Sequence, residues 1–201
     1  MTRHAHRLAW LLRHGALESK LAMDTGGFAA VDAVLRMVPL TRAELLRVVE
    51  ENDKSRYELT KDGARIRACQ GHSTAGTPVT CDGLEATWAR VLDDARVFHG
   101  TNVDAARAIL DGDGIDPVAR THVHLAASAG AKVGKRAHVD VLLAVDPVLI
   151  RAHGLALWRA TNGVLLARRV PKDAIVDVTA QSSAGERALA ALRAALMRGR
   201  A

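Results

Sequence analysis

The spacing of hydrophobic and polar positions changes character along the chain. Near the N-terminus apolar residues recur at helical spacing, which predicts three helices, over residues 7–14, 28–37 and 41–51. The third opens with Thr41 and Glu44, the pair that forms a capping box. Alternation then follows in two runs, 56–59 and 64–68, joined by the turn-forming pair Asp62-Gly63. Helices followed by a twisted hairpin predict a winged-helix-like module, which alone would suggest a nucleic-acid binder.

The second half of the chain shows short strand patterns instead. Residues 73–83 are rich in Ser, Thr, Gly and Pro and indicate a linker. Beyond it we expect a helix over 102–110 and strand segments over 97–101, 122–126, 139–145, 157–167 and 174–178. We therefore predict an α+β protein with three parts: a winged-helix-like lobe over 1–80, a small mixed-sheet lobe over 85–182 and a C-terminal helix over 183–201.

Composition narrows the class of protein. The 201 residues suit one large domain or two small ones, and a net charge of +6 permits a polyanionic partner. Two cysteines match neither a disulfide framework nor a zinc site. The uncharged apolar runs are too short to span a bilayer, and Arg13 and His14 interrupt any signal-peptide core. We therefore expect a cytoplasmic protein without a membrane partner.

Two basic positions in the N-terminal part are candidates for chemistry. Arg13-His14 ends an apolar helix, where a basic pair is most often solvent-exposed and without a specific role. In the second hairpin strand Ile66 and Ala68 share one face, so Arg67 points to the face that the core does not claim. An ordinary solvated strand face would look the same. The segment 70–73 that follows is polar and contains glycine, so its backbone amides could approach a ligand.

Histidines dominate the candidates in the second half. His122 and His124 share one strand face, and His99 could complete a metal site with them. No carboxylate or thiolate block accompanies the three histidines, so two imidazoles on a half-exposed strand are the plainer interpretation. Asn162-Gly163 is by itself a hairpin turn signal.

Six short blocks, taken in order, resemble the RNA 2′-phosphotransferase family. They are Leu12-Arg13-His14, Asn52-Asp53-Lys54-Ser55-Arg56-Tyr57, Arg67-Ala68-Cys69-Gln70-Gly71-His72-Ser73, Phe98-His99-Gly100-Thr101, Arg120-Thr121-His122-Val123-His124-Leu125 and Thr161-Asn162-Gly163-Val164. The resemblance implies an N-terminal lobe that binds RNA carrying a 2′-phosphate and a C-terminal, ADP-ribosyltransferase-like lobe that binds NAD as co-substrate. It implies no metal, and we expect a monomer.

The resemblance also assigns roles to residues. It implies a catalytic tetrad of Arg13, His14, Arg67 and Arg120, with Arg120 in the NAD lobe. It implies NAD contacts from His99, Gly100, Thr101, His122, His124, Ser128, Asn162 and Val164. Many ADP-ribosyltransferases carry a glutamate where Val164 stands; an anionic phosphate nucleophile needs no such base. Ala126-Ala127 departs from the family pattern, which often has a polar residue there.

The implied reaction transfers an internal RNA 2′-phosphate to NAD through a 2′-phospho-ADP-ribosylated RNA. Two alternatives share these features. One is an ADP-ribosyltransferase that caps terminal phosphates of RNA or DNA and stops after the first step. The other is a winged-helix regulator that only senses NAD; the complete set of Arg13, His14, Arg67 and Arg120 argues against it, because a sensor has no use for a phosphate clamp.

Overall fold

The computed structural model describes residues 3–51, 55–131, 134 and 138–198. By residue contacts the chain divides into two compact units. Unit 1 comprises Met1–Ala89, Val118–Thr121 and Ala160–Asn162, and unit 2 comprises Arg90–Pro117, His122–Arg159 and Gly163–Ala201. Both combine helices with small sheets, as an α+β protein should. The winged-helix-like and ADP-ribosyltransferase-like characters of the lobes stay predictions, and Asn52, Asp53 and Lys54 lie outside the described residues.

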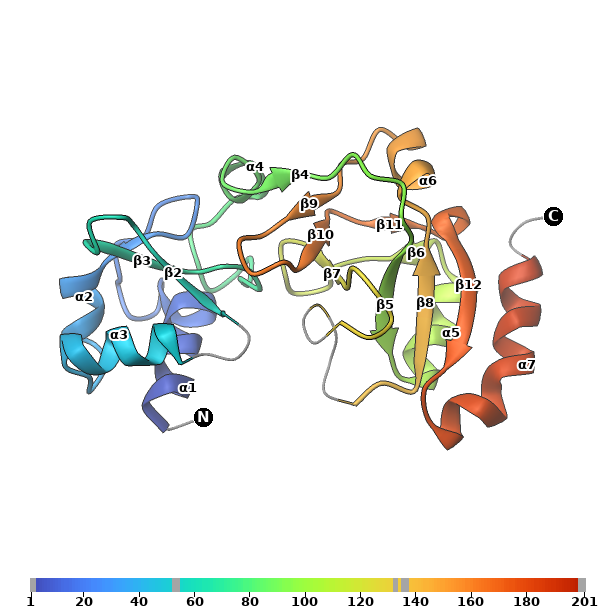
Figure 1. Ribbon diagram of the computed structural model, residues 1–201, viewed down its shortest axis with the longest axis horizontal. Helices are drawn as coiled ribbons and strands as arrows, with labels where there is room; N and C mark the ends of the chain where they lie inside the picture. The colour runs from blue at the N-terminus through green and yellow to red at the C-terminus, as the bar shows by residue number, and fades with distance from the viewer. Residues whose placement is uncertain (1–2, 52–54, 132–133, 135–137, 199–201) are drawn as a thin grey trace. The chain divides into compact units, whose positions relative to one another are not determined.

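Unit 1 is built from short helices and one small sheet (Figure 1). Its elements are α1 (Arg3–Trp10), the π-helix η1 (Leu11–Gly15), β1 (Ala29–Ala30), α2 (Val31–Leu35), α3 (Arg42–Glu50), β2 (Tyr57–Leu59), β3 (Arg65–Ala68) and α4 (Cys81–Glu85). The sheet has the order β1-β3-β2, and both pairings are antiparallel. A cluster of buried hydrophobic residues, drawn mainly from α1, η1, α2 and the hairpin, forms the main core of this unit.

Local signals in this unit predicted two features correctly. Thr41 caps α3 and forms the full capping box with Glu44, so both ends of the box are hydrogen-bonded. The hairpin β2–β3 turns at Asp62-Gly63, where Gly63 adopts φ 66°. Glycine reaches this left-handed conformation without the steric cost that a side chain would bring.

Two expectations for unit 1 are wrong. The segment 28–37 was expected to be one helix, but Ala29–Ala30 pair with β3 and the helix begins only at Val31. Pairing with the hairpin edge satisfies backbone groups that a helix would otherwise satisfy. The segment 73–83 is not a free linker. It contains buried Thr77, whose hydroxyl donates to the carbonyl oxygen of Ser73 at 2.8 Å, and it leads into α4.

Unit 2 contains three further small sheets. Its elements are β4 (Ala89–Arg90, at the sequence boundary with unit 1), β5 (Val97–Thr101), α5 (Val103–Asp111), β6 (Gly114–Ile115), β7 (Val123–Leu125), β8 (Val141–Val145), α6 (Pro147–Ala152), β9 (Trp158–Arg159), β10 (Leu165–Ala167), β11 (Val170–Pro171), η2 (Lys172–Ala174), β12 (Ile175–Ala180) and α7 (Ser183–Arg198). The strand orders are β4-β9-β10-β7, β11-β6 and β12-β8-β5.

A single mixed sheet was expected for this unit, but its strands form three separate sheets. The pairs among β5, β8 and β12, among β7, β9 and β10, and between β6 and β11 are all antiparallel. Parallel neighbours require a long crossover connection. Here α5 leads from β5 into β6, and β6 pairs in a different sheet from β5.

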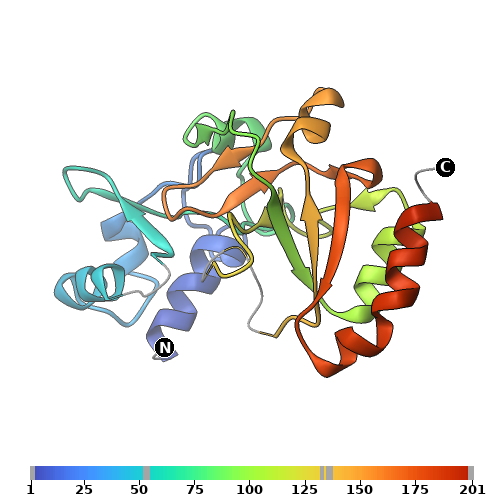
Figure 2. The same cartoon turned by 45° about the vertical axis from the view of Figure 1, so that its right-hand side comes forward.

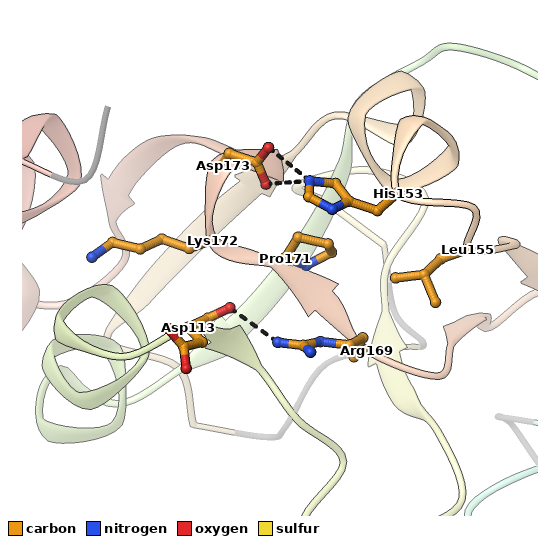
Figure 3. A pocket seen from close by; sticks show the side chains of 7 residues that line it. All are labelled: Asp113, His153, Leu155, Arg169, Pro171, Lys172 and Asp173. Carbon is orange, nitrogen blue, oxygen red and sulfur yellow. Dashed lines mark hydrogen bonds and ion pairs between the residues drawn. The ribbon is translucent and has the colours of Figure 1, made fainter. Parts of the chain in front are cut away.

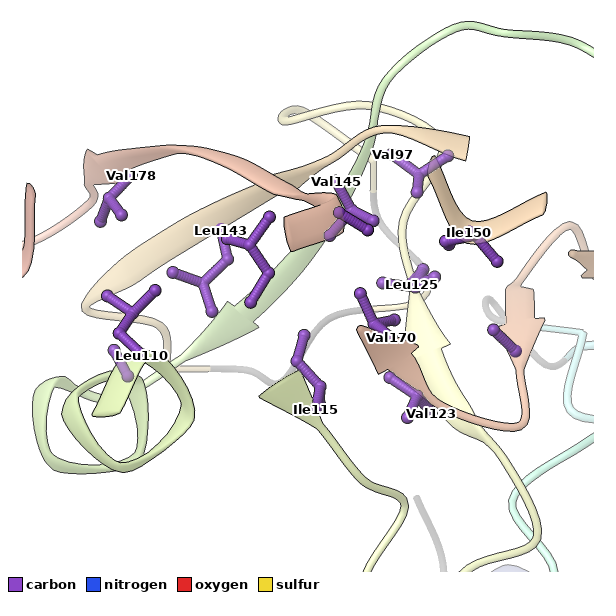
Figure 4. Close-up of a cluster of buried hydrophobic side chains, with 14 of the residues drawn as sticks. Val97, Leu110, Ile115, Val123, Leu125, Leu143, Val145, Ile150, Val170 and Val178 are labelled. Atoms are coloured by element: carbon purple, nitrogen blue, oxygen red, sulfur yellow. The ribbon is translucent and has the colours of Figure 1, made fainter. Parts of the chain in front are cut away.

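The core of unit 2 surrounds β8, whose five residues are all buried, as its nearly continuous apolar sequence predicted. Figure 4 shows side chains of Leu143 and Val145 from β8 beside those of neighbouring strands and α5. The C-terminal helix α7 lies along β12 and α5, and both ribbon views show this packing (Figure 2). Its buried side chains include Leu192 and Leu196, so this terminal helix belongs to the core. Among the described residues no helix has the length and apolar character needed to cross a bilayer.

Candidate active site

Arg13 and His14 lie in the π-helix η1, which continues α1 without a break. A π-helix has wider turns than an α-helix, and such turns are rare and concentrate at functional sites. Leu11 and Leu12 are buried, which anchors the turn in the core of unit 1. Anchoring by neighbours in the same turn fixes the backbone from which the arginine and the histidine extend.

The guanidinium group of Arg13 is partly buried. Its Nε and Nη2 atoms are buried and have no hydrogen-bond partner in the part of the chain that the structure describes. Burial is the largest influence on the pKa of Arg13 and lowers it; Tyr57, next in size, raises it, and the charges of Arg56 and Arg120 lower it. A buried donor without an acceptor is costly, so the position suits an anionic ligand that accepts from both nitrogens.

Arg120 reaches the same neighbourhood through backbone pairing. It forms an isolated antiparallel bridge with Ser73, and the N–H of Ser73 donates to the carbonyl oxygen of Arg13 at 2.8 Å. Arg120 was expected in the C-terminal lobe, but by residue contacts Val118–Thr121 belong to unit 1. The bridge to Ser73 is one of the contacts that this segment makes with unit 1. The Arg120 side chain is exposed.

His14 is exposed, and its surroundings lower the pKa of its imidazole. Partial burial lowers the pKa of His14, and the charges of Arg13 and Arg120 lower it further. Its carbonyl oxygen lies against Gly76, where an added Cβ would come within 1.9 Å of that oxygen. Gly76 thus permits a close backbone contact that fixes the position of His14.

Arg67 differs from its expected place on a face outside the core. Its side chain is 1% exposed. Nε and Nη2 donate to Glu58 Oε2 at 2.9 and 2.6 Å, Nη1 donates to the carbonyl oxygen of Gly26 at 3.2 Å and to the Thr87 hydroxyl, and the guanidinium carbon lies 4.5 Å from the Phe28 ring centre. Strand alternation keeps Arg67 out of the apolar cluster, but these neighbours cover the other face of the strand.

In unit 2 the structure brings His99 and His124 together. His99 Nδ1 lies 3.1 Å from the carbonyl oxygen of His124. A carbonyl oxygen only accepts, so Nδ1 carries the hydrogen, and this bond orients the ring. Phe98 and Ala126 exchange backbone hydrogen bonds of 2.9 and 2.8 Å, which places β5 beside the end of β7.

Beside His99, Gly100 and Thr101 are buried at the end of β5. An added Cβ at Gly100 would lie 2.9 Å from Val139 Cγ2, so a side chain there would require Val139 to shift. His122 and His124 differ in environment: His122 is almost fully buried and precedes β7, whereas His124 is half-buried within it.

The remaining predicted NAD contacts lie in different settings. Val164 is buried directly before β10, which pairs with β7. Ser128 is exposed, and Asn162 belongs to unit 1 by residue contacts. Within the described ranges no three His, Cys, Asp or Glu side chains are grouped so that they could hold a metal ion.

Sequence reasoning missed three polar residues. Glu58 is the cross-strand partner of Arg67, and the hairpin register set by Asp62-Gly63 would have revealed this opposite-charge pair. Thr161 donates to Glu58 Oε2 at 3.0 Å, and nothing in the sequence signals a contact so distant along the chain. Trp158 has a buried indole nitrogen with no acceptor among the described residues.

A separate pocket lies within unit 2 and contains none of the predicted site residues (Figure 3). It has a volume of about 420 Å³. Its lining residues are Asp113, His153, Leu155, Arg169, Pro171, Lys172 and Asp173. His153 Nε2 contacts Asp173 at 2.8 Å, and the imidazole's hydrogen bond lowers the pKa of that carboxyl. Arg169 donates to the Asp113 carbonyl oxygen at 3.3 Å. Within the lining, the imidazole of His153 and the carboxylate of Asp173 are thus paired with each other.

Comparison with known proteins points to the same family as the short sequence blocks described above. Residues 1–169 match the family model described as RNA 2′-phosphotransferase, Tpt1/KptA family. A probable RNA 2′-phosphotransferase of Burkholderia lata is 35% identical over 187 residues, covering 88% of this chain and 91% of the relative. The namesake proteins of Pseudomonas aeruginosa (strain UCBPP-PA14) and Agrobacterium fabrum are 37% and 36% identical over 174 and 184 residues, covering 82% and 88% of this chain and 90% and 94% of theirs. The chain therefore belongs to the RNA 2′-phosphotransferase, Tpt1/KptA family.

Proposed function

We propose that this chain is an NAD-dependent RNA 2′-phosphotransferase, which moves an internal RNA 2′-phosphate onto NAD. One observation carries the proposal. In unit 1 the charges of Arg13 and Arg120 both lower the pKa of His14. Two side-chain nitrogens of Arg13 are buried and have no acceptor in the described part of the chain. Planar guanidinium groups bind phosphate oxygens in pairs, so this set suits a compact dianion.

The first step joins RNA to ADP-ribose. An oxygen of the RNA 2′-phosphate attacks the ribose C1″ of NAD, the bond from C1″ to the nicotinamide nitrogen breaks, and nicotinamide leaves with the electron pair. The phosphate is already anionic, so no base is required. This agrees with a valine, Val164, at the position where many ADP-ribosyltransferases have glutamate.

The second step releases the RNA. Ribose O2″ attacks the phosphorus, the bond from phosphorus to the RNA 2′-oxygen breaks, and ADP-ribose 1″,2″-cyclic phosphate forms. We assign to His14, whose imidazole pKa is lowered, the transfer of the O2″ proton to the departing 2′-oxygen. Arg13 and Arg120 stabilise the charge that accumulates on the phosphate in this transition state.

We assign NAD binding to unit 2, with His99 and His124 as its centre. Their mutual hydrogen bond fixes the His99 ring, and Gly100 and Thr101 follow on the same strand. RNA binding is assigned to unit 1 because the basic set lies there. Arg67 remains in the proposed tetrad, but its side chain is buried and its guanidinium forms an ion pair with Glu58.

The test is a product analysis. The protein is incubated with a 2′-phosphorylated oligoribonucleotide, with and without NAD. We expect 2′-hydroxyl RNA, nicotinamide and ADP-ribose 1″,2″-cyclic phosphate, all dependent on NAD. A parallel reaction uses oligonucleotides with terminal phosphates only. Stable ADP-ribosylated termini, without any 2′-phosphate release in the first reaction, would replace this proposal with the terminal-capping activity.

A further inference from the structure

Glu58 gathers three hydrogen bonds on one carboxylate oxygen. Its Oε2 accepts from Arg67 Nε at 2.9 Å and from Arg67 Nη2 at 2.6 Å. The same atom accepts from the Thr161 hydroxyl at 3.0 Å. All three residues belong to unit 1. A single atom therefore connects a strand of the hairpin, its cross-strand neighbour and a segment that reaches unit 1 from late in the sequence.

The arginine in this cluster has little freedom. With 1% of its side chain exposed, Arg67 depends on Glu58 for its counter-charge, and its third nitrogen is held by Gly26 and Thr87. Two guanidinium nitrogens that donate to the same carboxylate oxygen constrain the guanidinium plane in direction as well as position. The orientation of Arg67 is consequently determined by where Glu58 lies.

Thr161 extends the constraint to the turn that follows. The chain continues from Thr161 through Asn162 and Gly163, which has φ 80°, to the buried Val164. Glycine at that φ makes a tight turn that a side chain would strain. Because the turn is short, fixing the hydroxyl of Thr161 restricts where Asn162 can lie.

We propose that Glu58 is a positioning residue that aligns Arg67 and the Thr161–Asn162 turn together, so that phosphate handling and NAD binding share one carboxylate. This inference rests on the proposed function, with Arg67 in the tetrad and with Asn162 as the NAD contact that the family resemblance implies. A purely structural Glu58 would only neutralise a buried arginine. The two possibilities differ in what the Thr161 bond does, because that bond adds nothing to the neutralisation of Arg67.

The decisive variant is Thr161→Val, which removes the hydroxyl and keeps the shape. We expect its KM for NAD to rise about three- to tenfold, the effect of losing one partly exposed hydrogen bond to a charged group, with kcat and melting temperature close to wild type. Thr161→Ser restores the hydroxyl and should restore KM. Thr60→Val is the matched control: Thr60 also donates to a carboxylate, that of Asp62, in the same hairpin but without touching Arg67.

A double-mutant cycle tests the shared carboxylate. Glu58→Gln keeps an acceptor but removes the charge, and should reduce kcat at least tenfold and raise KM for NAD. The double variant Glu58→Gln/Thr161→Val should raise KM by less than the product of the two single-variant increases. Each single substitution already disrupts the same Glu58–Thr161 interaction. Melting curves of each variant separate loss of fold from loss of alignment.

Two outcomes overturn the inference. One is an unchanged KM for NAD in Thr161→Val beside an active wild type. The other is fully multiplicative effects in the cycle, which would show that Glu58 and Thr161 act independently. Wild-type turnover is measured first with NAD and 2′-phosphorylated RNA. Absence of that turnover contradicts the proposed function itself, whereas an active wild type with indifferent Thr161 variants contradicts only the role of Glu58.

Discussion

Ser73 and Arg120 pair across an isolated antiparallel bridge, although Ser73 follows the β2–β3 hairpin and Arg120 comes only after β5, α5 and β6 in the sequence. The N–H of Ser73 also donates to the carbonyl oxygen of Arg13. Backbone hydrogen bonds thus set the spacing of the two arginines, and His14 follows Arg13 directly. Side-chain substitutions at these three positions should therefore alter chemistry more than architecture, which makes them suitable for kinetic tests.

Substituting Arg120 should slow the second step more than the first. Transesterification places extra negative charge on the phosphate, whereas departure of nicotinamide develops positive charge on the ribose, which a nearby cation does not favour. Arg120→Ala should accumulate RNA that carries ADP-ribose on its 2′-phosphate, with the second step slowed by about 10²–10³. Gel analysis of single-turnover reactions measures both steps.

Arg120→Lys is the matched control for that experiment. It keeps the charge and loses the planar fork, so it should trap less intermediate than the alanine variant. Equal slowing of both steps without any trapped intermediate would show that Arg120 contributes to substrate binding alone.

The imidazole of His14 should titrate below the ordinary histidine range. Burial lowers its pKa, and the charges of Arg13 and Arg120 lower it further. NMR titration of the ring protons should show this depressed pKa in the wild-type protein and a higher pKa in Arg120→Ala, because one cation is gone. A phosphate analogue bound near both arginines should also raise it. Identical titration curves in both proteins would remove Arg120 from the neighbourhood of His14.

The same shift has a consequence for stability. The folded protein binds a proton at His14 less readily than the unfolded chain, whose imidazole has a pKa near 6.5. The contribution of His14 to stability is therefore present above that pH and is lost as the pH falls from there through the folded pKa. In urea unfolding, His14→Gln should flatten the loss of stability on acidification below pH 6.5 relative to wild type. An unaltered pH dependence would contradict the shift.

Arg67→Ala should destabilise the fold as well as impair activity. Removing the arginine leaves Glu58 without its main partner and opens a buried space, so we expect a loss of about 3 kcal/mol in the free energy of unfolding. Arg65→Ala is the control: its ion pair with Asp24 is exposed on both sides and should contribute below about 1 kcal/mol. Urea titrations of both variants compare them. Equal stability of the two would show that the Arg67–Glu58 pair adds nothing to folding.

Chelation of metal ions should leave turnover unchanged. The chemistry proposed above stabilises phosphate charge with guanidinium groups, and the described residues contain no cluster suited to a metal. EDTA added to the assay with NAD and 2′-phosphorylated RNA should have no effect on the rate. Inhibition that a single added metal reverses would restore the metal site considered for His99, His122 and His124.

Local signals predicted the elements whose stability is local. The capping box of Thr41 and Glu44 and the Asp62-Gly63 turn are both present, because each depends on residues within three or four positions. The short strand at Ala29–Ala30 was missed, because two alanines have no strand signal and pair only through the edge that β3 offers. The π-helix η1 was missed for a similar reason, since its extra residue per turn leaves the apolar spacing nearly helical.

The same distinction between local and long-range signals applies to the site residues. The blocks around Arg13, His99 and His124 could be identified in the sequence, and the structure brings His99 next to His124. The burial of Arg67 could not be, because residues far from it in sequence, including Thr87, complete its surroundings. Arg120, grouped with unit 1, pairs with Ser73 through a backbone bridge, and such a bridge leaves no signal in local composition.

Gly76 shows how an unreactive residue can be as constrained as a catalytic one. A side chain there would overlap the His14 carbonyl oxygen and lie 2.7 Å from Ser73 Oγ. In a saturation library scored by activity, position 76 should therefore tolerate almost nothing but glycine, and its profile would resemble that of a reacting group. Intolerance to substitution at that position would reflect the steric clash with the turn that carries Arg13 and His14. Mutational maps of related chains should consequently be interpreted with the backbone in view before intolerance is taken as evidence of chemistry.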